Sequence, residues 1–473
     1  MNRFLYFFIF AFVVLKMLAL AGCANIIPPT GGPRDSLPPV LLKSDPEDYA
    51  RRFNEKIITF NFNEYIDLRD VRNELIVSPV PKLDPTVEAK LKVVTIKIKD
   101  TLEPNTTYSF NFGNSVRDIN EGNILKNFTY VFSTGNHIDS AEFSGRVLLA
   151  ATGKIDTTLI VMLHRHLDDS AVAKERPRYI ARLDSSGNFR FRYVEPGTYA
   201  LYALKDEGGQ KKYTTKTQMF AFADSPIIVK PDYVPVILYA YQDTSGSKPV
   251  KKSTGKPATA KKPEKEKERE KRLIVQLNLS NNQLDLLSNL MMVFPVPLKF
   301  FDSTKVHFKD STFKEITQFQ YVKDTSNKKI TLIYKWAPET KYYLIAEKDF
   351  GEDTLGQKLL KTDTITIQTK KESDYGSVRL RFPNINLSKN PILQFLQGEA
   401  VKDSFSFRSS KMFYRKLFPP GEYELRILYD NNNNGHWDPG EFFDKHIQPE
   451  KVVPIKQKLN VRSNWDNEVD IQL

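Results

Sequence analysis

Short runs in which apolar and polar residues alternate recur along most of the chain. They include ITFNFN at 58–63, YSFNF at 108–112, VRLRF at 378–382 and YELRI at 423–427. Successive side chains of a β-strand point to opposite faces, so each run buries one face and exposes the other. Turn residues separate the runs, and long stretches of helical periodicity are absent. The pattern predicts an all-β protein built from β-sandwiches.

Two kinds of sequence unit occur twice. LEPNTTYSFNFGNSVRDINEGNIL at 102–125 and WAPETKYYLIAEKDFGEDTLGQKL at 336–359 share Pro, then Thr, then Tyr at the head of an alternating strand, and then an Asp-rich turn. The segments 187–209 and 403–435 each have a strand, a Pro-Gly turn, a strand beginning near a Tyr and an Asp-led loop. The repeat predicts four sandwiches in the order A-B-A′-B′: A at 38–136, B at 137–244, A′ at 273–370 and B′ at 371–473.

The motifs of these units resemble those of known families. The DSLPP segment, the LEPNTTYSFNFG strand and the FSTG ending make A similar to the bacterial Ig-like domain of the SbsA type. The whole chain resembles outer-membrane lipoproteins that open with this domain. The B units, marked by PGTY and PGEY, resemble the prealbumin-like sandwiches of carboxypeptidase regulatory domains and cell-wall adhesins. The resemblance implies a multidomain string of sandwiches with an accessory or scaffold role rather than a reaction.

Residues 1–22 have the pattern of a lipoprotein signal peptide. A basic start at Arg3 precedes the apolar run 4–15, and Leu20-Ala21-Gly22-Cys23 follows. We expect cleavage before Cys23, lipidation of its sulfur and a tether at 23–37. The alternative is a transmembrane anchor, but Lys16 ends the apolar run short of the ~20 residues that a span needs. Cys23 is the only cysteine, so disulfides are excluded. By the sorting pattern of Gram-negative lipoproteins, the absence of Asp after Cys23 favours the outer membrane, with the periplasmic face favoured over the cell surface.

The segment 245–272 is predicted to be a flexible linker. It has almost no large apolar residue and carries eleven Lys or Arg against four Glu, which is +7 of the chain's formal charge of +12. The basic balance is therefore mostly a property of the linker, and nucleic acid is not an expected partner. We expect trypsin to cut first within 248–272 and to leave A-B and A′-B′ halves that each stay folded.

The chain offers little that resembles an active site. His164 and His166 would share a face of a strand, but no third metal ligand follows, and solvent-facing histidines at a strand end are the expected arrangement. Carboxylate pairs such as Asp118/Glu121 and Glu352/Asp353 fall in turns, where such side chains bind backbone amides. We therefore expect neither an enzyme nor a small-molecule substrate.

The loop YDNNNNGHWDPGEF at 429–442 has the spacing of a calcium site, D-x-[DN]-x-[DN]-G-x₅-E. Calcium prefers six to eight oxygen ligands, and Gly435 allows the sharp turn that such a loop needs. Because a strand precedes the loop, the context is not an EF-hand. The alternative is an Asn-rich turn held by side-chain-to-backbone hydrogen bonds. The predicted structural Ca²⁺ ligands are Asp430, Asn432, Asn434, the carbonyl of His436, Asp438 and Glu441.

These observations favour a non-enzymatic, lipid-anchored scaffold or interaction protein of the cell envelope. One specific version is an accessory subunit of an outer-membrane protein assembly or secretion machine, attached to the membrane by its lipid and bound to envelope proteins. The alternative is a glycan-binding lipoprotein for nutrient capture, which would need a groove floored with exposed aromatic side chains.

Overall fold

The computed structural model describes residues 9–13, 34–230, 232–243, 272–281, 283–443 and 445–473. The predicted lipidation site at Cys23 and nearly all of the predicted linker lie outside these residues. No helix in the described ranges is long and apolar enough to cross a bilayer. From residue 34 onward the described chain consists of strands, turns and a few one-turn helices, so the predicted all-β class is confirmed.

Sandwich A begins with β1 and ends with β9. Its elements are β1 (Leu41–Asp45), β2 (Ile57–Phe62), β3 (Ile66–Leu68), α2 (Val71–Glu74), β4 (Ile76–Ser78), β5 (Thr86–Lys90), β6 (Val93–Lys97), β7 (Thr107–Asn111), β8 (Val116–Asp118) and β9 (Thr129–Ser133). The sheets have the strand orders β1-β2-β6-β5 and β4-β7-β9, and β3 pairs with β8. Phe60, Phe110 and Phe132 from the two main sheets meet in the core, as the alternation of their strands predicts.

Sandwich B has two sheets, with the strand orders β13-β10-β17 and β12-β11-β14-β15. Its elements are β10 (Ala141–Leu149), β11 (Leu159–His164), α3 (Ala171–Lys174), β12 (Tyr179–Arg182), β13 (Asn188–Val194), β14 (Gly197–Lys205), β15 (Phe220–Phe222), β16 (Ile227–Val229) and β17 (Val236–Ala240). Strand β16 extends the second sheet by pairing with β14. The central strand β10 pairs antiparallel with β13 and parallel with β17.

Sandwich A′ repeats the strand order of A and adds one edge strand, β19, to its second sheet. Its elements are β18 (Gln276–Leu277), β19 (Gln283–Leu284), β20 (Leu290–Val293), β21 (Leu298–Phe301), η1 (Ser303–Lys305), β22 (Val306–Lys309), β23 (Gln320–Lys323), β24 (Lys329–Ile333), β25 (Lys341–Ala346), β26 (Gly351–Asp353) and β27 (Asp363–Thr369). Its sheets run β18-β20-β24-β23 and β19-β27-β25-β22, and β21 pairs with β26. The equivalent tyrosines of the Pro-Thr-Tyr motif accept equivalent hydrogen bonds, Glu103 N to Tyr108 Oη at 2.9 Å and Ala337 N to Tyr342 Oη at 3.2 Å.

Sandwich B′ repeats the strand order of B. Its elements are η2 (Glu372–Asp374), β28 (Gly376–Arg381), η3 (Leu387–Lys389), β29 (Pro391–Gln397), β30 (Ala400–Ser406), β31 (Met412–Phe418), β32 (Gly421–Tyr429), β33 (Lys451–Val461) and β34 (Asp466–Asp470). Its sheets run β31-β28-β34 and β30-β29-β32-β33, and β28 pairs parallel with β34 as β10 does with β17. In the Pro-Gly turns, Tyr199 Oη donates to Glu195 O at 2.9 Å and Tyr423 Oη donates to Pro419 O at 3.0 Å.

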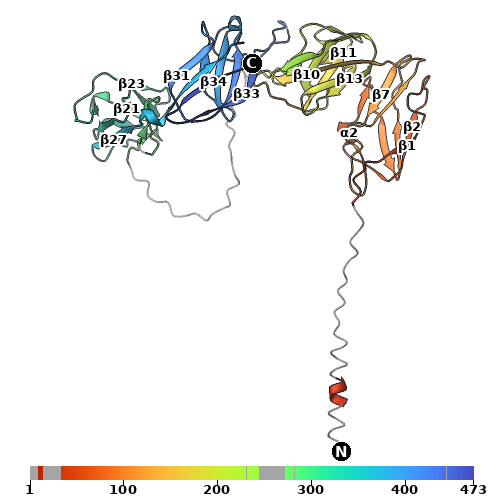
Figure 1. Ribbon diagram of the computed structural model, residues 1–473, viewed down its shortest axis with the longest axis horizontal. Coiled ribbons are helices and arrows are strands. Elements are labelled where there is room, and N and C mark those ends of the chain that lie inside the picture. Colours follow the sequence, from red (N-terminus) through yellow and green to blue (C-terminus); the bar gives the residue numbers. More distant parts are fainter. Residues whose placement is uncertain (1–8, 14–33, 231, 244–271, 282, 444) are drawn as a thin grey trace, which may run out of the picture.

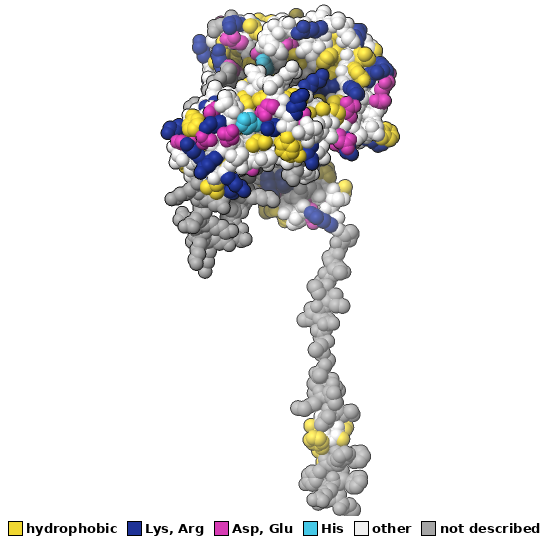
Figure 2. Space-filling model, turned by 90° about the vertical axis from the view of Figure 1, so that its left-hand side faces the viewer, with side chains coloured by type: hydrophobic (Ala, Val, Ile, Leu, Met, Phe, Trp, Pro, Cys, Tyr) yellow, Lys and Arg dark blue, Asp and Glu magenta, His cyan; other side chains and the backbone are white. Residues whose placement is uncertain are grey.

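The four sandwiches lie in a row whose order differs from their order in the chain. Figure 1 shows A′ at one end, then B′, then B, and A at the other end. B′ contacts A′ through a hydrogen bond of 2.8 Å from Leu286 N to Tyr375 Oη. Seen from the A′ end, positively and negatively charged side chains are interspersed over the surface (Figure 2). The folded sandwiches therefore join end to end as A-B-B′-A′.

The junction between B and B′ is a shared hydrophobic cluster. Phe442 of B′ is 2% exposed and packs among Tyr202, Phe220 and Phe222 of B. The backbone amide of Val452 in β33 donates to a turn of B, at the carbonyl of Ala150, over 2.9 Å. The two halves of the chain thus bury apolar surface against each other. The sequence did not predict this contact, because it lies in a loop whose polar composition concealed it. That each half stays folded after a cut within 248–272 stays a prediction.

Candidate functional site

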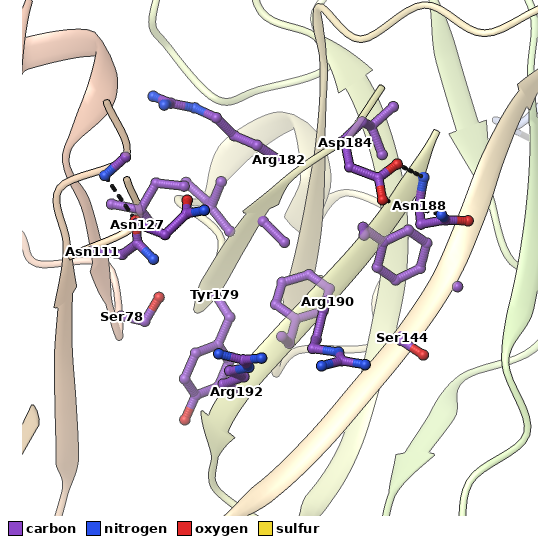
Figure 3. A pocket seen from close by; sticks show the side chains of 18 of the residues that line it. Ser78, Asn111, Asn127, Ser144, Tyr179, Arg182, Asp184, Asn188, Arg190 and Arg192 are labelled. Atoms are coloured by element: carbon purple, nitrogen blue, oxygen red, sulfur yellow. Dashed lines mark hydrogen bonds between the residues drawn. The ribbon is translucent and has the colours of Figure 1, made fainter. Parts of the chain in front are cut away.

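A groove of about 760 Å³ lies between sandwiches A and B (Figure 3). Its A wall is formed by polar side chains of the sheet β4-β7-β9 and the turn before β9. Strand β7 (TYSFN) turns Tyr108 and Phe110 into the core, so Ser109 and Asn111 face outward toward B. Ser109 is still only 8% exposed because B covers this face. The side chains of A that line the groove include Ser78, Ser109, Asn111, Asn127 and Thr129.

The B wall carries arginines from three strands. Strand β13 begins NFRFR, and its alternation places Phe189 and Phe191 in the core and Arg190 and Arg192 on the outer face. In Figure 3 these two arginine side chains extend into the space between the A and B ribbons. The charged side chains of B at the groove are Arg146, Arg182, Asp184, Arg190 and Arg192.

The arginines of the groove differ in how fully they are paired. Arg182 forms an ion pair of 3.0 Å with Glu74 across the A–B boundary. Arg190 and Arg192 share one carboxylate, Glu142, at 3.8 and 3.4 Å, and both arginine side chains are more than half exposed. Neither of these two donates a hydrogen bond to another residue in the described part of the chain. The groove therefore holds guanidinium donors that are free to bind an anion.

Contacts between A and B fix the position of the two walls. The amide of Val80 donates to the carbonyl of Arg178 at 2.9 Å, which joins the end of β4 to the start of β12. Arg178 also donates to Glu103 at 2.6 Å, and this hydrogen bond is the main cause that lowers the pKa of Glu103. Tyr49 and Tyr193 are joined through their hydroxyls at 2.6 Å. These contacts between A and B hold the two walls of the groove in a fixed relative position.

The loop 429–442 lies beside the B–B′ junction, and Asp430 is its buried anchor. Asp430 is 1% exposed, and its two oxygens accept the amides of Asn434 at 3.2 Å and Gly435 at 2.7 Å. Gly435 has a φ of 83°, in the region that favours glycine. Asn432 and Asn434 accept the amides two residues further on. These are the side-chain-to-backbone bonds of an Asn-rich turn, the alternative weighed above.

Further carboxylates gather on the same loop. Asp438 accepts the side-chain amides of Asn432 and Asn434 at 2.6 and 2.7 Å. Glu450, which is 4% exposed, accepts the amides of Asn431 and Asp438 at 2.7 and 3.1 Å. Burial raises the pKa of Glu450, and the charges of Asp430 and Asp438 raise it further. Sequence reasoning missed Glu450 because it lies nine residues beyond the motif, directly before β33.

The predicted ligand Glu441 takes a different position. Its carboxylate accepts from Lys445 at 2.8 Å and pairs with Lys216 of B at 3.5 Å. In the described residues no group of three or more His, Cys, Asp or Glu side chains is arranged to hold a metal. The amide of His436 donates to Asn434 at 2.7 Å. The structure therefore brings together Asp430, Asn432, Asn434 and Asp438, adds Glu450, and leaves Glu441 at the junction.

The two histidines singled out from the sequence lie in different surroundings. His166 is exposed and contacts Glu175 at 2.7 Å. His164 is 1% exposed at the end of β11, packs edge-on against Tyr202, and burial lowers its pKa to about 4. The prediction that both face solvent is wrong for His164, because this side chain points into B and packs against Tyr202 of β14. Asp118, in contrast, accepts the amides of the turn after it, as predicted.

In comparisons with known proteins, family models match two of the four sandwiches. Residues 35–134 match the family model "Bacterial Ig-like domain", so A is such a domain. Residues 152–218 of B match the model "Polysaccharide lyase family 4, domain II". No protein with a curated description matches the chain.

Solved structures with a similar arrangement of strands are distant. Native alpha-2-macroglobulin from Escherichia coli, spanning domains MG0-NIE-MG1, is 14% identical, with 39% of this chain and 72% of that chain covered and a TM-score of 0.20. The TIE protein of Bacillus anthracis is 10% identical, with 94% and 75% covered and a TM-score of 0.16. BcpA, the major pilin subunit of Bacillus cereus, is 9% identical, with 70% and 99% covered and a TM-score of 0.16. Likenesses of this strength do not bear on function.

Proposed function

We propose that this chain is a non-enzymatic, lipid-anchored scaffold of the bacterial cell envelope. The observation that carries the proposal is the B–B′ junction. It converts four small sandwiches, each of a kind that supplies binding surface rather than catalysis, into one elongated body. Such a body offers partner proteins a long surface with a fixed relation between its parts.

Several kinds of contact support a fixed B–B′ junction. Beside the buried Phe442, the His446 ring contacts Asp169 at 2.6 Å and Gln448 donates to the carbonyl of Phe222 at 3.0 Å. A turn of B lies against β33, which covers an otherwise open sheet edge. Apolar packing, hydrogen bonds and ion pairs together favour a junction that does not hinge freely.

The sequence supports the anchor. Lipidation at Cys23 would leave 11 residues before Arg34, whose guanidinium donates to Glu121 O at 3.1 Å on sandwich A. Eleven extended residues reach about 40 Å at most, so A would be held within that distance of the membrane. We propose the outer membrane, with the periplasmic face favoured over the cell surface.

We further propose a structural role for calcium in the loop 429–442. The loop and the residue that precedes β33 contribute the carboxylates of Asp430, Asp438 and Glu450, although these three are not arranged to hold a metal as they stand. Burial raises the pKa of Glu450 and the charges of Asp430 and Asp438 raise it further, and a cation would offset those charges. Asn432 and Asn434 add side-chain oxygens, each with a lone pair beyond the hydrogen bond it accepts. Calcium would stabilise the loop that carries Phe442 into B. It would supply no chemistry.

Co-purification tests the scaffold proposal. A tagged full chain, isolated from detergent-solubilised membranes, should bring down outer-membrane proteins in a constant ratio across preparations. A Cys23→Ser variant serves as the control, and it should fractionate with soluble proteins and lose those partners. Recovery of the wild-type chain alone, with no partner in any detergent tested, would count against a scaffold.

A further inference from the structure

We propose that the groove between sandwiches A and B binds an acidic polysaccharide through the carboxylates of its sugars. This ligand is additional to the partner proteins of the proposed scaffold, and its site is separate from the surface that would bind them. The site also differs from the aromatic-floored groove that a neutral glycan would need.

The two arginines of β13 are the anion-binding groups. Arg190 and Arg192 stand two residues apart on one face of a strand, so their Cα atoms are separated by about 7 Å. The single carboxylate of Glu142 lies 3.8 and 3.4 Å from them, beyond hydrogen-bond length for the first and at its limit for the second. One positive charge on this pair is therefore unbalanced. The guanidinium fork is suited to bidentate binding of a carboxylate.

The corresponding sandwich B′ shows what a balanced arrangement looks like. Arg379 and Arg381 also stand two apart on the outer face of a strand, β28. They bind Glu468 at 3.1 and 2.9 Å, and Arg381 also binds Asp470 at 3.2 Å. Each of these arginines thus has close carboxylate partners within the protein. The pair in B lacks such partners among the described residues, although its sheet has the same strand order.

The opposite wall offers groups that match sugar hydroxyls. The side chains of Ser78 and Asn127 line the groove and make no hydrogen bond to another described residue. Hydroxyl and amide groups both donate and accept, as polyhydroxylated ligands require. A chain of sugars lying in the groove would contact these groups on one side and the arginines on the other.

The lining disfavours a peptide as the ligand. An extended peptide added to a sheet edge takes its specificity from pockets for alternate side chains. Tyr179, Phe189 and Phe191 at the groove are 1–3% exposed, because their rings belong to the core of B. These three rings therefore form no open pocket for a peptide side chain. Ile237 of the same wall is 51% exposed, so a ligand would meet apolar surface there beside the guanidiniums of Arg190 and Arg192.

The groove is held open before any ligand arrives. The Val80–Arg178 backbone bond, at 2.9 Å, and the Arg182–Glu74 ion pair, at 3.0 Å, join its two walls. A site that is already formed loses little conformational freedom when it binds, so a modest number of contacts suffices. The volume of about 760 Å³ lies in the range of ligand sites.

Binding of a defined oligosaccharide to the full chain tests the proposal. The probe is fluorescently labelled tetragalacturonate, measured by anisotropy at low salt, beside its fully methyl-esterified form and an acidic peptide of equal charge. We expect the wild type to bind the acid form and neither the ester nor the peptide. The double variant Arg190→Gln/Arg192→Gln should weaken binding at least about 100-fold, because each of the two lost charged hydrogen bonds costs roughly tenfold or more.

Arg379→Gln/Arg381→Gln is the matched control, because it removes the same charge from the equivalent sheet of B′. Unchanged binding in this control, together with an unchanged melting temperature in both double variants, would locate the site in the groove. Absence of binding by the wild type, equal loss in both double variants or equal binding of the peptide would overturn the proposal. The wild type and Arg190→Gln/Arg192→Gln should co-purify with the same envelope proteins. A failure of the polysaccharide proposal would therefore leave the scaffold proposal standing.

Discussion

Phe442→Ala should loosen the junction between B and B′. The Phe442 ring is 2% exposed, and its centroid lies 5.5, 5.2 and 5.0 Å from those of Tyr202, Phe220 and Phe222 in B. Truncating a buried Phe to Ala costs about 3–5 kcal/mol. Part of that loss falls within B′, where Phe442 also contacts Phe443 and His446. We therefore expect about 3 kcal/mol in the association of the halves, or roughly 100-fold in Kd.

The assay separates the halves covalently and measures whether they stay together. A specific protease site placed within 248–272 would be cut, and the products examined by size-exclusion chromatography and calorimetry. Wild-type A-B and A′-B′ should co-elute as one particle, whereas the Phe442→Ala halves should separate at micromolar concentration. Tyr414→Ala, at a residue that is 52% exposed on the far sheet of B′, is the control and should behave as the wild type. Separation of the wild-type halves after the cut would refute the shared junction, and so would an unchanged Kd in Phe442→Ala.

Three further results are expected. Burial lowers the pKa of His164 from 6.5 to about 4, so the unfolded chain takes up the proton first as the pH falls. The free energy of unfolding, measured by urea denaturation, should therefore fall by about 2 kcal/mol between pH 8 and pH 5. His164→Leu should abolish this loss. Calcium at 100 times its Kd should add about 2.7 kcal/mol to the free energy of unfolding of the full chain. The melting temperature should rise accordingly, and Asp430→Ala should remove the rise. No rise in the wild type would mean that the loop is a turn without a calcium site. Gly153 has a φ of 66°, and the Cβ added by Gly153→Ala would lie 2.3 Å from the side chain of Pro454 in B′. The substitution should therefore weaken association of the cut halves. Unchanged association would mean that Gly153 and Pro454 are not in close contact in solution.

Local patterns predicted much of the fold. Alternation identified β2, β28 and β32, since each has one more buried and one more exposed face. It also identified β7, whose outer face carries polar residues but is covered by B. The Pro-Thr-Tyr and Pro-Gly-x-Tyr motifs marked the repeats because each tyrosine closes a hydrogen bond within a few residues. Such short-range bonds are readable from sequence. The strand orders then showed that A′ repeats A, although their sequences resemble each other only weakly.

Contacts between distant segments could not be read in the same way. Phe442 lies in a loop of Asn, Asp and Gly, and nothing local shows that it is covered by residues more than 200 positions earlier. The groove likewise depends on Val80 meeting Arg178, which no periodicity encodes. His164 looked like a surface residue because the Tyr202 ring that packs against it comes from β14, later in the chain. Glu450 joins the polar loop only through the return of β33.

Site-specific photo-crosslinking in intact cells tests the scaffold most directly. A photoreactive phenylalanine analogue would replace one exposed residue in each sandwich, with Tyr65, Ile228, Phe313 and Tyr414 exposed by 50%, 59%, 53% and 52%. The account predicts that at least one position forms adducts of defined mass with envelope proteins. The same adducts should be absent when the analogue stands at the other positions. Full-level, membrane-anchored protein that yields no adduct from any of the four sandwiches would contradict it.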